Sequence, residues 1–146
     1  MKSVAGCLVL ITGLALAMTS AVVAGEPLGQ KQYKRYCALC HGDEGKGDAP
    51  YAELLKIPTI DLTQLGTKNA GAFPFQRVYE VIDGRQTVAA HGPRGMPIWG
   101  DIFLVESKDE PNPYPYGPWG SQQQYEDFVN GRIAALVLYL ATIQTQ

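Results

Sequence analysis

Hydrophobic and polar residues divide the chain at about residue 24. Residues 4–17 are almost wholly apolar, they follow Lys2, and Val22-Val23-Ala24 comes after them. A positive start, a short apolar run and a small-x-small site are typical of a secretory signal peptide. The apolar run is too short to predict a membrane span. We therefore expect residues 1–24 to be a cleaved signal peptide and residues 25–146 to form a single domain.

Helical periodicity is clearest near the C-terminus. A stripe of apolar residues predicts a helix over residues 132–140 that turns this face to the core; its members are Ile133, Leu136, Val137 and Leu140. Ser121 and Gln124 have the spacing of a capping box, which predicts a helix start. Asn130-Gly131 is expected to interrupt that helix.

Shorter elements are predicted in the middle of the chain. A helix is expected over residues 27–40, and a short one over residues 51–55, which must end before Pro58. Residues 75–82 predict another helix, with Gly84 near its C-cap. Residues 107–120 contain four prolines and are expected to form turns or extended segments. They either pack on the domain or form a loop that shields a cofactor or docks a partner.

Charge excludes two classes of partner. The chain has 12 Lys and Arg and 14 Asp and Glu. Loss of residues 1–24 would remove one basic residue, Lys2, and no acidic residue, leaving a net charge of −3. A nucleic-acid binder needs a basic stripe, and a membrane-surface protein needs a polybasic segment. The same cleavage would leave Cys37, Cys40 and Met96 as the remaining cysteines and methionine.

Candidate chemistry is concentrated in Cys37-Ala38-Leu39-Cys40-His41. A disulfide across so short a loop would constrain the unfolded chain little. A redox pair would lie beside a strand-helix-strand pattern, which we do not find here. Structural zinc needs four N or S ligands, and His91 lacks the spacing of a zinc-binding partner for His41. Covalent haem attachment fits better, because residues i and i+3 share a helix face.

In that interpretation each residue of the motif has a role. Cys37 and Cys40 can form thioethers to the two vinyl groups of one haem, and His41 brings an imidazole nitrogen to the iron. An export signal together with two remaining cysteines favours this interpretation over the others.

With this motif in place, the chain resembles class I (mitochondrial-type) cytochromes c of the bacterial periplasm, over about residues 27–104 and 131–144. Gly29 and Tyr33 are similar to a glycine and an aromatic residue in the N-terminal helix of that family, which crosses the C-terminal helix. Glycine there allows a close backbone approach. The resemblance implies that Tyr139 packs near Gly29.

The resemblance also implies the fold and the cofactor. It predicts an all-α cytochrome c fold, with about three to five helices wrapped around one covalently bound haem c. Residues 107–120 depart from the family pattern and would form a Pro-rich insertion before the C-terminal helix.

Residues 95–100 resemble the family loop that carries the second axial ligand. Met96 is then the expected ligand, because a thioether sulfur is soft and a Met and His pair raises the haem potential. His91 is the rival and would give a bis-histidine site of lower potential. A third alternative is an open site that takes small ligands or peroxide.

The resemblance suggests further contacts to the haem. A proline carbonyl accepts the Nδ1 proton of the axial histidine in the family, and such a bond fixes the ring. Pro58 is the candidate here, with Pro50 as the alternative. Arg94 and Arg85 could meet the haem propionates or remain solvated at the surface. Trp99, in the Met96 loop, is a further candidate cofactor-binding residue.

The expected function is periplasmic one-electron transfer between redox proteins, not catalysis. The alternative is a haem subunit or dedicated electron acceptor of a periplasmic dehydrogenase or oxidase. An open-site haem enzyme or gas sensor is a third class. The expected partners are redox donors and acceptors, which would meet the protein at a basic rim formed by Arg85 and Arg94. The protein is expected to be monomeric or transiently associated, with no nucleic acid and no stable membrane insertion after cleavage.

Overall fold

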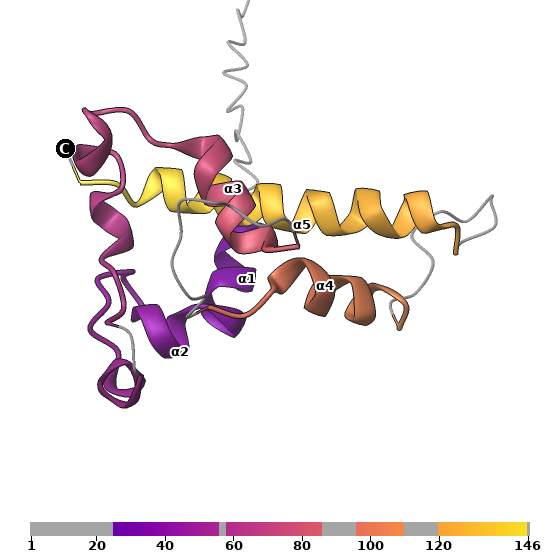
Figure 1. Ribbon diagram of the computed structural model, residues 1–146, viewed down its shortest axis with the longest axis horizontal. Coiled ribbons are helices and arrows are strands. Elements are labelled where there is room, and N and C mark those ends of the chain that lie inside the picture. Colours follow the sequence, from indigo (N-terminus) through magenta and orange to yellow (C-terminus); the bar gives the residue numbers. More distant parts are fainter. Residues whose placement is uncertain (1–24, 56–57, 86–95, 110–119, 146) are drawn as a thin grey trace, which may run out of the picture.

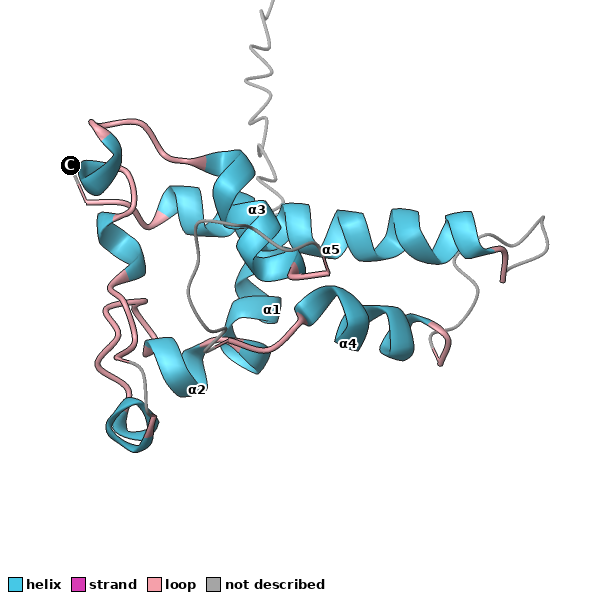
Figure 2. Cartoon of the chain, in the orientation of Figure 1, coloured by secondary structure: helices cyan, strands magenta, loops and turns pink. Residues whose placement is uncertain are grey.

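The computed structural model describes residues 25–55, 58–85, 96–109 and 120–145. These residues form five α-helices and three short 3-10 helices and contain no strand (Figure 2). The α-helices are α1 (Leu28–Tyr36), α2 (Ala38–His41), α3 (Phe75–Asp83), α4 (Trp99–Ser107) and α5 (Gln122–Thr142), and the 3-10 helices are η1 (Pro50–Leu54), η2 (Leu62–Gln64) and η3 (Thr67–Asn69). The predicted all-α class is confirmed.

Helix α5 is the element on which the others are assembled. Helices α1, α3 and α4 each pack against it, and α3 also contacts α4 (Figure 1). The predicted apolar stripe of α5 is buried, so that prediction is confirmed. It forms one core with residues from α1, α3, α4 and η2: Tyr33, Leu62, Val78, Ile82, Phe103, Val129, Ile133, Leu136, Val137 and Leu140.

The start of α5 follows its prediction, but its interior does not. The Ser121 hydroxyl accepts a hydrogen bond from the Gln124 backbone, and the capping box is complete. The expected interruption at Asn130-Gly131 is wrong, because the helix continues through both residues. Glycine inside a helix costs about 1 kcal/mol. Burying an apolar side chain such as Val129 or Ile133 contributes about 1.5–3 kcal/mol, so continuation is favoured.

The crossing of α1 and α5 matches the expectation. A Cβ atom on Gly29 would fall on the carbonyl oxygen of Ala135 and lie 2.9 Å from the Cβ of Tyr139. The rings of Tyr33 and Tyr139 pack beside this point, with their centroids 5.3 Å apart. The two helices therefore approach closely because residue 29 has no side chain.

Two of the remaining elements were predicted only in part. The helix expected over residues 27–40 is divided at Cys37, where φ is −110°, so α1 ends and α2 begins there. Residues 50–54 form a 3-10 helix near the expected short helix. Helix α3 agrees with its prediction to one residue, and Gly84 caps it with a φ of 69°.

Helix α4 was not predicted. Trp99 and Gly100 were expected in a loop, but they begin a helix that ends at Ser107. Apolar residues lie on several sides of this helix, so it has no clear periodic pattern. Within the described ranges, no helix has both the length and the apolar character to cross a membrane. The expectations for residues 1–24, 110–119, His91 and Arg94 lie outside the described residues.

Candidate functional site

The candidate site is built where α1 passes into α2. Cys37 lies between the two helices, and Cys40 and His41 belong to α2. The Cys37 carbonyl accepts hydrogen bonds from the backbone N–H groups of Cys40, at 3.1 Å, and His41, at 2.9 Å. Both cysteines are free thiols and half-buried. A single helical turn therefore carries two thiols and an imidazole.

Burial sets the ionisation of these groups. It raises the pKa of Cys37 to about 12, with a smaller contribution from the neighbouring Cys40 thiol. Burial also lowers the pKa of His41, and the backbone of Ile60 opposes this shift. At neutral pH Cys37 is therefore a protonated thiol and His41 a neutral imidazole. A neutral imidazole has the nitrogen lone pair that a metal requires.

The surroundings of His41 come from a glycine loop and the chain that follows η1. The Gly47 N–H donates to the His41 carbonyl at 2.8 Å, and Gly47 has a φ of 76°. A Cβ atom on Gly47 would lie 2.7 Å from the Thr59 carbonyl oxygen. A residue with a side chain would be strained in that conformation and would push residues 59–60 away from His41.

This arrangement brings Ile60, rather than a proline, to the His41 ring. The Nδ1 atom of His41 is buried and makes no hydrogen bond of ordinary geometry in the described part of the chain. The Ile60 backbone lies close enough to the His41 ring to raise its pKa against the effect of burial. No sequence signal marks Ile60, because every residue has a backbone carbonyl.

The loop after α2 is also fixed to the core. The hydroxyl of Tyr33, which is fully buried, donates to the Gly42 carbonyl at 2.5 Å. The Leu62 N–H donates to the Gly45 carbonyl at 2.7 Å. Burial raises the pKa of Tyr33, so the phenol remains a donor at physiological pH. The loop that follows the thiol-bearing turn is therefore held by α1, through Tyr33, and by η2, through Leu62.

Met96 and Trp99 reach the same region from a distant part of the sequence. Met96 is half-buried and packs on the hydrophobic core, as does Cys37. The Trp99 ring meets the Tyr36 ring edge-on, with the centroids 5.5 Å apart. Tyr36 directly precedes Cys37, so the structure brings the Met96–Trp99 segment to the thiol-bearing turn.

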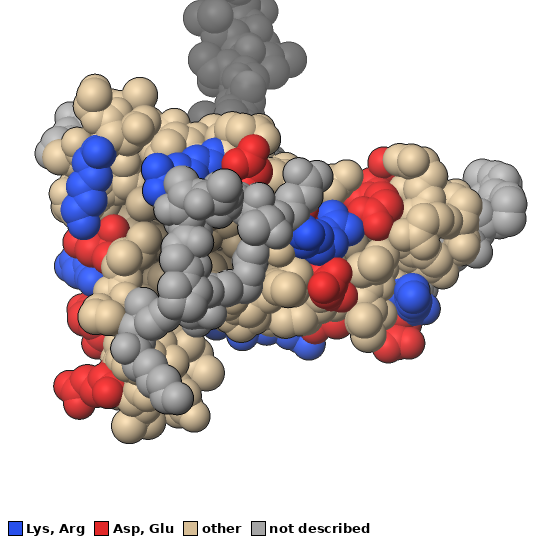
Figure 3. Space-filling view, viewed as in Figure 1, with Lys and Arg blue, Asp and Glu red and all other residues tan. Residues whose placement is uncertain are grey.

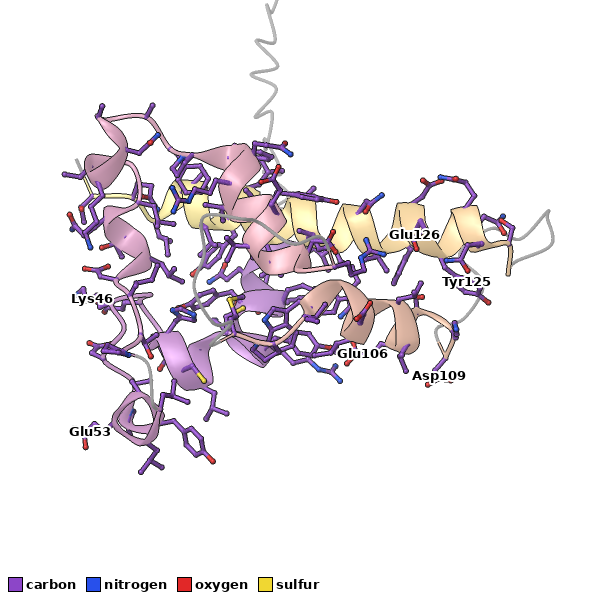
Figure 4. The ribbon with its side chains drawn as sticks, in the orientation of Figure 1. Lys46, Glu53, Glu106, Asp109, Tyr125 and Glu126 are labelled. Atoms are coloured by element: carbon purple, nitrogen blue, oxygen red, sulfur yellow. The ribbon has the colours of Figure 1, made fainter. Side chains whose placement is uncertain are left out.

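A buried charge network that sequence reasoning missed supports Tyr36. The Arg132 Nη2 donates to Gln32, at 3.1 Å, to the Tyr36 hydroxyl, at 3.1 Å, and to Glu106, at 2.9 Å. The guanidinium carbon lies 4.0 Å from the centroid of the Phe103 ring. The Tyr36 hydroxyl in turn donates to Glu106 at 2.8 Å. This network joins α1, α4 and α5; Figure 4 shows Glu106 on α4.

The expected role of Arg85 is corrected by the structure. Its guanidinium is paired with Asp83, at 2.6 Å, and with Glu126, at 2.5 Å, and its side chain is 21 % exposed. It therefore does not supply a free basic charge to a propionate or a docking rim. On the face drawn in Figure 3, basic and acidic side chains are intermixed. Arg94 lies outside the described residues.

The residues present fit a haem with covalent attachment. The two thiols on one turn are free, and the imidazole beside them is neutral at neutral pH. A thioether sulfur lies on the core that Cys37 also contacts. Imidazole and thioether are both axial ligands of haem iron in cytochromes c, and the aromatic residues Tyr36, Trp99 and Phe103 supply an apolar surround.

The comparison with known families agrees with this fit. Residues 26–109, more than half of the chain, match the family described as Cytochrome C oxidase, cbb3-type, subunit III, whose model is a c-type cytochrome domain. No curated protein and no solved structure matches the chain. The chain therefore belongs to this family and is a c-type cytochrome, an electron-transfer protein and not an enzyme, with covalently attached haem c.

Proposed function

We propose that this cytochrome is a periplasmic one-electron carrier in which Cys37 and Cys40 hold the haem and His41 and Met96 ligate its iron. The observation that carries the proposal is the contact between Tyr36 and Trp99, because it joins the thiol-bearing turn to the segment of Met96. Bound haem supplies an iron that cycles between Fe(II) and Fe(III), one electron at a time.

Each side chain contributes a separate property. The two thioethers fix the haem to α2, so the cofactor cannot be lost when its iron changes charge. The buried, neutral His41 offers a nitrogen lone pair, and Met96 offers a soft sulfur that favours the reduced state and raises the potential. With both axial positions filled, no substrate reaches the metal, which is the condition for a carrier rather than a catalyst.

Periplasmic location is part of the proposal. Its support is the N-terminal pattern of Lys2, the apolar residues 4–17 and the small residues ending at Ala24. In the periplasm the residues 25–146 would act without the N-terminal segment.

A second candidate function is favoured by the family description. That description names a subunit of a cytochrome oxidase, so this chain would serve as a haem subunit, or as a dedicated electron donor, of such an oxidase. Purification from native membranes distinguishes the two functions. A carrier separates from the oxidase at moderate salt, whereas a subunit remains with it in constant ratio.

The ligand assignment is tested by Met96→Ala. Removal of the thioether should open the iron, lower the midpoint potential and allow carbon monoxide to bind the reduced protein readily. His91→Ala is the matched variant, and it should leave both properties unchanged. The assignment is wrong when His91→Ala opens the iron and Met96→Ala does not.

A further inference from the structure

Charged side chains outside the haem motif lie at the end of α3 and beside the start of α4, the helix that follows Met96. Arg85 follows α3 and its C-cap Gly84. Its Nε donates to the Asp83 carboxylate at 2.6 Å, and its Nη1 donates to Glu126 of α5 at 2.5 Å. We call Asp83, Arg85 and Glu126 the charge clamp.

The charge clamp is more protected than an ordinary surface ion pair. The side chains of Asp83, Arg85 and Glu126 are 14 %, 21 % and 29 % exposed. Hydrogen bonds between ionised groups are about twice as strong as neutral ones. The hydrogen bond from Arg85 is also the main cause that lowers the pKa of Glu126 below its ordinary value, so the carboxylate is ionised at neutral pH.

Gly100 brings the start of α4 close to the charge clamp. It is buried, and it is the second residue of α4. A Cβ atom on Gly100 would fall on the Asp83 carboxylate and lie 2.9 Å from the Cδ of Arg85. The start of α4, just after Met96, is therefore packed directly on the charge clamp, where α3, α4 and α5 meet (Figure 1). Glu126 extends this contact to α5 (Figure 4).

We propose that the charge clamp is a positioning device for Met96, which sets how readily the Met96 sulfur leaves the haem iron. This inference rests on the proposed ligation by Met96. The start of α4, three residues after Met96, packs directly on the charge clamp, and this packing restricts the movement of Met96. Departure of the Met96 sulfur would require the start of α4 to move, and the charge clamp makes that movement less favourable. None of its three residues needs to touch the iron.

The direct test is Glu126→Gln, which removes one charge with little change of shape. Imidazole is the probe, since it binds ferric haem only where Met96 has left. The variant should bind imidazole about tenfold more tightly, the factor expected when one charge-assisted hydrogen bond is lost. The weak red absorption band of sulfur-ligated ferric haem should lose intensity, and the midpoint potential should fall.

The matched control is Asp127→Asn, the next residue on the same helix. Asp127 is exposed and accepts a hydrogen bond from Gln123 at 2.8 Å. Its substitution makes the same change in net charge, but it leaves the charge clamp intact. Imidazole affinity, band intensity and potential should all stay at the values of the unsubstituted protein.

A second pair of variants separates positioning from general destabilisation. Arg85→Gln should also tighten imidazole binding, and adding Glu126→Gln to it should cause little further change, because the pair is already broken. Arg85→Lys, which keeps the charge, should restore part of the loss. All variants are compared under conditions in which circular dichroism shows them fully folded, so the band reports ligation and not unfolding.

The outcomes distinguish this inference from the proposed function. Equal imidazole affinity in Glu126→Gln and Asp127→Asn, with the sulfur band present in all proteins, overturns the charge clamp and leaves Met96 ligation standing. Absence of the sulfur band from the unsubstituted protein overturns the Met96 ligation and the charge clamp with it. Tight imidazole binding confined to the Glu126 and Arg85 variants supports both.

Discussion

Gly29 sets how closely α1 and α5 can cross, because its position has no room for a side chain. A Cβ atom there would overlap the Ala135 carbonyl. We expect Gly29→Ala to destabilise the protein by about 1–3 kcal/mol, the usual cost of overpacking. The free energy of unfolding in denaturant measures this effect on the haem-loaded protein.

The chain offers a matched control on the partner helix. Gly131 lies inside α5, and a Cβ atom there would have no neighbour within 4 Å. Gly131→Ala should therefore be neutral or stabilise the helix by up to about 1 kcal/mol. Equal destabilisation by the two substitutions would show that the close approach at Gly29 has no special cost.

Other single residues control the chemistry of the site rather than its packing. Before haem attachment, burial raises the pKa of the Cys37 thiol and lowers the pKa of the His41 imidazole. Each shift favours the uncharged form of its side chain, and both shifts depend on how deeply this turn lies in the fold. The Cys-x-x-Cys-His spacing predicts which side chains act, and the fold determines how deeply they are buried.

At the scale of elements, Arg132 joins three helices through a buried charge. It donates to Gln32 and Tyr36 at the α1 side and to Glu106 of α4. We expect Arg132→Ala to destabilise the protein by about 3 kcal/mol, the low end of the range for breaking a buried ion pair, because Glu106 loses its charged partner and keeps the Tyr36 hydroxyl. Denaturant unfolding measures the loss.

A control for Arg132 comes from the same residue type on α1. Arg35 is exposed, and its guanidinium carbon lies 5.2 Å from the centroid of the Tyr36 ring. Arg35→Ala should cost no more than about 1 kcal/mol, the range for a cation–π contact at an exposed site. A loss as large as that of Arg132→Ala would contradict the special role of the buried network.

The elements that sequence could predict are those with local signals. The C-terminal helix, the capping box at Ser121 and the C-cap at Gly84 depend on residues a few positions apart, and all three are confirmed. Helix α4 has no clear periodicity, so its pattern gave no signal. Continuity of α5 through Gly131 depends on tertiary burial, which outweighs the local preference of glycine.

The parts of the site that escaped prediction depend on long-range contacts. Ile60 acts near His41 through its backbone, and backbone groups have no signature in the residue type. Arg132 meets residues that lie 100 and 26 positions away along the chain. Nothing in the sequence around Arg85 distinguishes it from a solvated surface arginine. Its pairing with Asp83 and Glu126 is seen only in the folded structure.

At the scale of the whole molecule, the covalently attached haem is expected to be part of the packed structure. The helices pack on α5, while the thiol-bearing turn and the Met96 segment meet at the core through Tyr36 and Trp99. A covalently held cofactor beside that meeting point would add to the contacts that Tyr36 makes with Trp99, Phe103 and Glu106. Electron transfer by this family member therefore depends first on which residues hold the haem.

That dependence is tested most directly by mass spectrometry of the purified, denatured and trypsin-digested protein. Cleavage after Arg35 and Lys46 releases the peptide 36–46, which contains Cys37, Cys40 and His41. We expect this peptide to carry the mass of one haem through both sulfurs, and Cys37→Ser or Cys40→Ser to reduce attachment to a single thioether. Recovery of the same peptide with free thiols or an internal disulfide, and no haem, would contradict the account.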